Sequence, residues 1–246
     1  MDLVYIVRNG DDNEELRVSL RSIEKYAPKY DNVIIVGYKP EWVSDKVIYI
    51  PTHQRKKRSK WENSRNNLIT ACKSPLVSEY FILMNDDFIA TRPIIDWSES
   101  LLKAKNTLQE QILKWEEKNI TSDYTKSFNK MVDFISDITG QSTPINYELH
   151  IPMIINKTKF NNLLENPKVI EFIENNKIIL YRSLYGNVYN IPILEFIEDV
   201  KYYRAEPKEI TTEWISLFDK CIGSKKFPKL NSFLYKTFDK KSIYEN

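Results

Sequence analysis

The first hundred residues alternate between short apolar runs and polar stretches in which apolar residues recur at helical spacing. The apolar runs have the length of buried strands and cover residues 3–7, 33–37 and 47–50. Between the first two runs, apolar residues recur every three or four positions from Leu16 to Ala27, and Pro28 ends this helical pattern. Strand, helix and strand in this order predict parallel strands joined by a right-handed crossover. The N-terminal part is therefore predicted to be an open α/β sheet, with ligands beyond the carboxyl ends of its strands.

A further apolar run, Tyr80 to Met84, leads directly into Asn85, Asp86 and Asp87. A buried strand does not tolerate unpaired charge, so acids at its carboxyl end indicate a site. If the strand continues to Asp87, alternation places Asn85 and Asp87 on one face and Asp86 on the other. Asp87 is then the first candidate ligand for Mg²⁺ or Mn²⁺, which prefer carboxylate oxygen. The alternative is that the acids cap the next helix.

The remaining chain mixes helical and extended patterns. Helical spacing dominates residues 97 to 137, and Tyr147–Ile155 is predicted to be a strand with Glu148 and His150 on one face. Further predicted elements are helices at 157–164 and 167–174, a short strand at 200–203, and a C-terminal segment, 228–246, formed by a docked helix and a frayed end.

Composition places few limits on function. The chain has 246 residues and a formal net charge of +2, which neither demands nor excludes nucleic acid as a partner. Its two cysteines, Cys72 and Cys221, form no metal-binding or disulfide pattern, which indicates a reducing cytoplasm. No apolar run approaches the roughly 20 residues of a membrane-spanning helix, so we expect a soluble, cytoplasmic protein.

The order of these elements resembles the nucleotide-sugar half of GT-A glycosyltransferases. The resemblance rests on the strand Val4–Val7, the helix Leu16–Ile23, the later helix with Arg65 and Asn66, and the apolar strand that ends in acids. Asn85-Asp86-Asp87 would stand where that fold carries its Asp-x-Asp metal motif, although the first acid is here an amide. The second strand ends in Val36-Gly37-Tyr38 and lacks the Asp that holds the nucleotide base in many of these enzymes.

This resemblance implies an α/β, Rossmann-like fold with a mixed, mainly parallel sheet flanked by helices, a helical insertion and a C-terminal helical region. It further implies one GT-A-like domain over 1–246, with a nucleotide-sugar-binding half (1–96), a helical insertion (97–140) and an acceptor-side half with the C-terminal helices (141–246). Met84–Phe88 and Glu148–Pro152 also resemble motifs of the Stealth family of sugar-phosphate transferases. Phe227-Pro228 and Ser242–Glu245 resemble a closing pattern of phage-encoded glycosyltransferases.

A metal-dependent transferase would need donor-binding, metal-binding and catalytic residues. The donor-binding candidates are Arg8, Asn9, Asp11, Arg65, Asn85 and Asp86. Arg65 shares a helical stripe with apolar residues, so its half-buried guanidinium must find an anion such as a diphosphate. Asp87 and His150 are the candidate ligands of Mn²⁺ or Mg²⁺ and, with Glu148 as base or acceptor clamp, the candidate catalytic residues. A structural role is an equally good interpretation of His150.

A basic segment adjoins the predicted site and bears on the acceptor. It comprises Arg55, Lys56, Lys57, Arg58 and Lys60 and ends at Trp61. It could bind the donor's phosphates, an anionic acceptor or a nucleic-acid backbone, or be a solvated surface. Arg182, among several tyrosines, could line an acceptor groove or belong to the core.

Three functional hypotheses remain open at this point. The first is a metal-dependent glycosyltransferase (a hexosyl- or pentosyltransferase) acting on an acceptor such as a hydroxymethylated pyrimidine of bacteriophage DNA. The second is a Stealth-like transferase that moves a sugar phosphate onto a polysaccharide. The third is a nucleic-acid-binding module without catalytic activity.

Overall fold

The main sheet of the protein has the predicted parallel core. The computed structural model describes residues 1–10, 12–54, 60–202, 209–217 and 221–246. Five strands form the sheet in the order β3-β2-β1-β4-β9, and all neighbours are parallel except β9, which pairs antiparallel with β4. The strands are β1 (Asp2–Val7), β2 (Val33–Gly37), β3 (Ile48–Pro51), β4 (Tyr80–Asn85) and β9 (Met153–Asn156). The predicted α/β class is confirmed.

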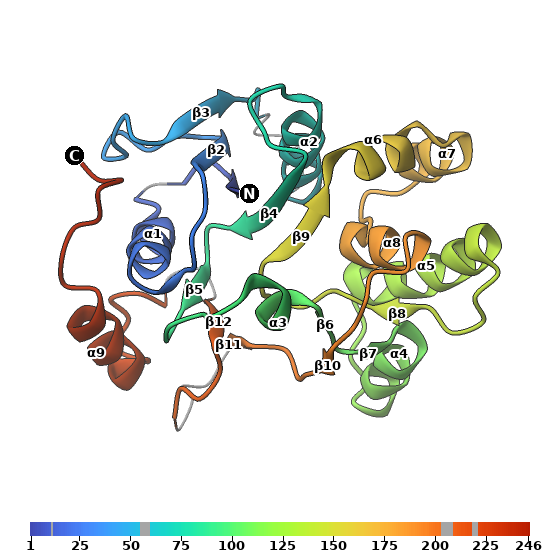
Figure 1. Cartoon of the computed structure of the whole chain (residues 1–246). Coiled ribbons are helices and arrows are strands. Elements are labelled where there is room, and N and C mark those ends of the chain that lie inside the picture. Colours follow the sequence, from blue (N-terminus) through green and yellow to red (C-terminus); the bar gives the residue numbers. More distant parts are fainter. Residues whose placement is uncertain (11, 55–59, 203–208, 218–220) are drawn as a thin grey trace.

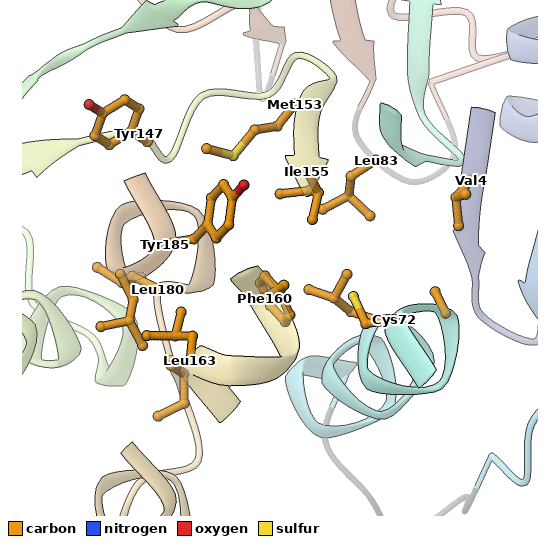
Figure 2. Close-up of a cluster of buried hydrophobic side chains, with 14 of the residues drawn as sticks. Val4, Cys72, Leu83, Tyr147, Met153, Ile155, Phe160, Leu163, Leu180 and Tyr185 are labelled. Atoms are coloured by element: carbon orange, nitrogen blue, oxygen red, sulfur yellow. The ribbon is translucent and has the colours of Figure 1, made fainter. Parts of the chain in front are cut away.

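Helices cover both faces of this sheet because its strands are apolar on both faces. Leu3 and Tyr5 of β1 pack in one core cluster with the buried face of α1 (Glu14–Tyr26). Val4 points to the opposite face, where α2 (Lys60–Lys73) and α6 (Lys157–Glu165) lie. Figure 2 shows part of this second cluster, in which Leu83 and Ile155 from adjacent strands lie near helical residues of α2 and α6.

A group of helices extends the second core away from the main sheet. These helices are α4 (Leu108–Glu117), α5 (Asp123–Thr139), α7 (Pro167–Asn175) and α8 (Tyr181–Val188), and α3 (Trp97–Leu101) precedes them. Short strand pairs connect this region: β6 (Lys103–Ala104) with β10 (Glu195–Phe196), and β7 (Asn106–Thr107) with β8 (Ile145–Asn146). Figure 1 shows α4, α5 and α8 at the opposite end of the molecule from α9 (Pro228–Thr237).

A second, three-stranded sheet lies beside the main sheet and carries the C-terminal region. It has the order β11-β12-β5, with β5 (Phe88–Ala90), β11 (Lys201–Tyr202) and β12 (Trp214–Leu217). Its residues Ile89, Ile215 and Leu217 share a core cluster with α9 and with Val18 of α1. None of the described helices, α1 to α9, is long and apolar enough to cross a membrane.

The structure corrects the predicted strand at 80–87. Strand β4 ends at Asn85, and Asp86 and Asp87 form a turn before β5 begins at Phe88. The alternation that was expected to separate Asp86 from Asp87 therefore does not apply, because it holds only within a strand. Both acids line the same cavity, described below.

The predicted strand at 147–155 is also wrong in its first half. Residues 147–152 form an irregular connection between β8 and β9, in which the amide of Leu149 donates to the carbonyl of Tyr147. Tertiary hydrogen bonds hold this connection, since the amide of His150 donates to Asp199 rather than to a neighbouring strand. The predicted helical region 97–137 is interrupted by the short strands β6 and β7, whereas the turn near residue 119 falls in the polar segment 116–123, where the sequence predicts a surface turn.

The C-terminal end is ordered rather than frayed as predicted. The side chain of Glu245 is fully buried and ion-paired with Arg17 and Arg21 of α1. The Tyr244 hydroxyl lies 2.7 Å from that of Tyr30, and Val43 forms a β-bridge with Glu245. These contacts attach the last residues to the N-terminal half of the chain.

Candidate active site

A cavity of about 500 Å³ opens where β1 and β4 end. Arg8 directly follows β1, and Asn85 to Asp87 follow from β4, as expected for a ligand site at the carboxyl edge of a parallel sheet. The first turns of α2 supply Lys60, Trp61 and Arg65. The irregular connection before β9 supplies Glu148 and His150.

Most of the candidate residues from the sequence lie around this cavity. Those that line it are Arg8, Lys60, Trp61, Arg65, Asn85, Asp86, Asp87, Glu148, His150 and Arg182. Asn9 is not among the lining residues, and its amide donates to the Gln54 side chain. Asp11, Arg55, Lys56, Lys57 and Arg58 lie outside the described residues.

Charges of both signs face the cavity. Its described basic side chains are Arg8, Lys60, Arg65, Arg182 and Lys201, and its described acids are Glu15, Asp86, Asp87 and Glu148. A cavity with this many cations suits a polyanion such as a diphosphate. The acids suit hydroxyl groups or a cationic group.

Asp86 has a strongly perturbed carboxyl group. Burial, and then the negative charge of Asp87, raise the pKa of Asp86 to about 7, although the Arg8 guanidinium opposes the shift. Near neutral pH this group exchanges a proton, so it can donate as well as accept hydrogen bonds. Such a perturbed carboxyl in a cleft is typical of a functional site.

The shifted pKa of Asp86 predicts a pH-dependent effect on stability. Between the ordinary value of 3.8 and about 7, the unfolded chain has lost this proton while the folded protein keeps it. Stability therefore falls as pH rises through this window, and Asp86→Asn should remove the loss. We expect the variant to be about 1–3 kcal/mol more stable than the wild type at pH 8, with a gap that closes toward pH 4, in urea unfolding.

The matched control for this experiment is Asp133→Asn, because Asp133 is exposed on α5. Its stability relative to the wild type should not vary with pH. An Asp86→Asn protein that is less stable than the wild type at pH 8 would contradict the assignment.

Asp87 is part of a buried ion pair that sequence reasoning did not find. Its Oδ2 atom accepts hydrogen bonds from Lys201 Nζ at 2.8 Å and from Ser216 Oγ at 2.5 Å. The Asp87 and Lys201 side chains are only 13% and 18% exposed. The carboxylate is thus held by the second sheet and does not project freely into the cavity.

Glu148 is positioned next to Arg182 by the start of α8. Its Oε1 atom accepts a hydrogen bond of 3.0 Å from the backbone amide of Ser183. Burial raises the pKa of Glu148, against the opposing effects of the Ser183 amide and of the Arg182 charge. A carboxylate with a raised pKa is a better proton acceptor near neutral pH.

Arg182 itself carries an unsatisfied donor. Its Nη1 atom donates to the carbonyl of Ile151 at 2.6 Å, whereas its Nη2 atom is buried and has no hydrogen-bond partner among the described residues. Burial lowers the pKa of Arg182, although the charges of Glu148, Asp87 and Asp199 oppose that shift. A buried donor of this kind is stabilised by an anionic ligand.

His150 is paired with Asp199, a residue that the sequence did not single out. The ring Nδ1 lies 2.8 Å from Asp199 Oδ2, and the backbone amide of His150 donates to Asp199 Oδ1 at 3.0 Å. Burial would raise the pKa of Asp199, but the hydrogen bonds and charge of His150 outweigh it and lower the pKa. This pairing fixes the ring orientation at the cavity wall.

The far wall of the cavity carries Arg65 and Tyr181. The Nη1 atom of Arg65 is buried without a hydrogen-bond partner among the described residues. An anionic ligand in the cavity would supply an acceptor for this guanidinium. Burial raises the pKa of Tyr181 to about 12, and the nearby Arg65 charge opposes the shift. At the mouth, Lys60 Nζ lies 5.0 Å from the ring centroid of the partly exposed Trp61.

Among the described residues, these side chains do not form a three-ligand site for a divalent cation. Asp87 Oδ2 accepts from Lys201 and Ser216, and His150 Nδ1 is bonded to Asp199, so these two atoms are engaged within the protein. Across the described ranges, no three His, Cys, Asp or Glu side chains come close enough together to hold a metal ion. A three-ligand site built on Asp87 and His150 would need a further ligand that the described His, Cys, Asp and Glu side chains do not supply.

Comparison with known proteins bears on the fold. No family model matches the chain, and no curated protein matches it. Among solved structures, it is similar to the galactosyltransferase LgtC in complex with donor and acceptor sugar analogues, with a TM-score of 0.53 and 9% identity over 99% of this chain and 98% of that chain. It is also similar to the bifunctional glycosyltransferase WbbM, with a TM-score of 0.51 and 10% identity over 97% of this chain and 50% of that chain. The chain therefore has the GT-A glycosyltransferase fold that its sequence predicts.

Proposed function

We propose that this chain is a glycosyltransferase that moves a sugar from a nucleotide-sugar donor to an acceptor hydroxyl. The observation that carries the proposal is the cavity at the carboxyl edge of β1 and β4, with buried guanidinium nitrogens in its wall. Its volume of about 500 Å³ falls within the usual range for small-molecule sites. The GT-A fold supports the same assignment, since its solved examples include a galactosyltransferase with donor and acceptor analogues bound.

The cavity offers separate groups for the parts of the donor. Arg65 and Arg182 each have a buried N–H without a described partner, and both suit the oxygens of a diphosphate. Arg8 lies beside Asp86, which suits a sugar or ribose hydroxyl. During transfer, the bond between the anomeric carbon and the diphosphate oxygen breaks, and its electron pair leaves with the diphosphate. The acceptor oxygen forms the new bond to the carbon and loses its proton.

Glu148 is the proposed acceptor of that proton. Its carboxylate lies in the cavity wall, and the Ser183 amide and Arg182 hold it in place. His150 is a positioning residue in this scheme, oriented by Asp199 beside Glu148. The resemblance implies dependence on Mn²⁺ or Mg²⁺, and donor titrations with and without Mn²⁺ test this dependence.

Binding of nucleoside diphosphates tests the donor site directly. We expect calorimetric titration with UDP, GDP, ADP and dTDP to show binding of at least one of them. Arg65→Gln should weaken that binding about 10-fold or more, because a charge-assisted hydrogen bond is lost. Arg92→Gln, at an exposed position that does not line the cavity, should not. A wild type that binds none of the four, with or without Mn²⁺, would contradict the proposal.

For the acceptor, we propose a hydroxymethylated pyrimidine in DNA. Lys60 and Trp61 support this, since they place a cation and a partly exposed aromatic ring at the cavity, at the end of the basic segment. Hydroxymethylated DNA incubated with a panel of nucleotide sugars should gain the mass of one sugar per modified nucleoside. No gain, from protein that binds nucleoside diphosphate, would favour the Stealth-like transfer to polysaccharide.

A further inference from the structure

The second sheet places a lysine ammonium inside the donor cavity. Lys201 lines the cavity together with Asp87, and their charged atoms are 2.8 Å apart. Both side chains are largely shielded from water, so the pair is weakly screened by salt.

Strand pairing fixes this ammonium in place. Lys201 of β11 is the register partner of Ser216 in β12, and Ser216 is the register partner of Phe88 in β5. The Ser216 hydroxyl donates to the same Asp87 oxygen as Lys201, and the amide of Leu217 donates to the Asp87 carbonyl. Asp87 is therefore held at three points by one sheet, and Lys201 is held with it.

Arg182 adds a second fixed cation beside this pair. The Asp87 charge acts on Arg182, and so do the charges of Glu148 and Asp199. The guanidinium keeps one buried N–H without a described partner. Lys201 and Arg182 approach Asp87 from different elements, β11 and α8, and both line the cavity.

We propose that Lys201, held by Asp87 and assisted by Arg182, supplies the positive charge for the leaving diphosphate, so that donor binding and transfer need no divalent cation. This inference rests on the proposed function and concerns the same site. In the transfer step, the bond between the anomeric carbon and the diphosphate oxygen breaks, and its electron pair stays on that oxygen. The two cations stabilise the negative charge that develops on the diphosphate. No proton passes to Lys201, and the acceptor proton goes to Glu148. Fixed cations aimed at developing charge stabilise it without reorganisation.

The test compares diphosphate and nucleoside binding in the presence of a chelator. Wild-type protein treated with EDTA should bind its preferred nucleoside diphosphate with an affinity within about 3-fold of that in excess Mn²⁺. Lys201→Met, which keeps chain length but loses the charge, should bind the diphosphate at least about 10-fold more weakly. Its affinity for the nucleoside without phosphates should be unchanged, and Lys201→Arg should retain most of the diphosphate affinity. A merely structural role of Lys201 would weaken both ligands together.

Removing one partner of a buried pair can unfold a protein, so a double variant completes the design. Lys201→Met with Asp87→Asn leaves no unpaired charge and should show the same selective loss of diphosphate binding. This inference would be overturned if the wild type bound the diphosphate only with Mn²⁺ and Lys201→Met did not weaken that binding. The glycosyltransferase proposal would then still stand. Absence of diphosphate binding in both conditions would overturn the two together.

Discussion

Glu148→Gln is expected to lower the rate of sugar transfer by about 10²–10⁴-fold, the usual contribution of a positioned general base. The substitution keeps the shape of the side chain and an oxygen that can accept from the Ser183 amide, but the amide cannot take a proton. The donor diphosphate is assigned to other side chains, so its dissociation constant should change by less than about 3-fold. Single-turnover rates with acceptor present and calorimetric donor binding measure the two effects separately.

Two further variants make the Glu148 prediction specific. Glu117→Gln, at an exposed position of α4, is the matched control and should leave both quantities unchanged. His150→Gln should reduce the rate less than Glu148→Gln, because His150 only positions its neighbours in this scheme. A Glu148→Gln protein with normal turnover, together with an inactive but folded His150→Gln protein, would move the role of base to the His150–Asp199 pair.

Glu245→Ala is expected to destabilise the protein by about 3–5 kcal/mol, the typical cost of breaking a buried ion pair from one side. Glu245 accepts from Arg21 at 2.7 Å through both carboxylate oxygens and from Arg17 at 3.2 Å. The backbone amide and the hydroxyl of Ser242 also donate to it. Without the carboxylate, two arginines remain half-buried beside an empty pocket. Urea unfolding followed by circular dichroism measures the difference, and Glu174→Gln, exposed on α7, should change stability by less than about 0.5 kcal/mol.

The same residue predicts how stability depends on acid. Burial opposes ionisation of Glu245, but the hydrogen bonds from Arg21 outweigh it and lower the pKa to about 2 from the ordinary value of 4.5. A depressed carboxyl pKa contributes stability that is fully present above pH 4.5 and is lost as pH falls toward 2. Glu245→Gln should therefore flatten the loss of stability across this window. If the free energy of unfolding of Glu245→Gln fell between pH 4.5 and 2 as steeply as that of the wild type, Glu245 would not be the source of this pH dependence.

The sequence alone determined the framework of the fold. The apolar runs at 3–7, 33–37 and 80–84 are the strands β1, β2 and β4, and the helical periodicity after Glu14 is α1. These elements follow from local patterns, because a strand buried on both faces requires a continuous apolar run and a surface helix requires an apolar stripe. The parallel order then fixes the edge at which ligands bind, so residues such as Arg8 and Asp86 could be predicted to lie near a site.

Only the tertiary structure decided which side chains of that site form hydrogen bonds and ion pairs with one another. Asp87 was expected to face a metal ion, yet its partners Lys201 and Ser216 come from strands more than a hundred positions later in the chain. His150 is oriented by Asp199, and Glu245 pairs with Arg21 of α1, which lies more than two hundred positions earlier in the chain. Such pairs depend on which strands meet in the second sheet and on where the chain end docks. A local pattern of apolar and polar residues carries no information on either. Ion pairs form between side chains that are close in the folded structure, and these can be far apart in the sequence.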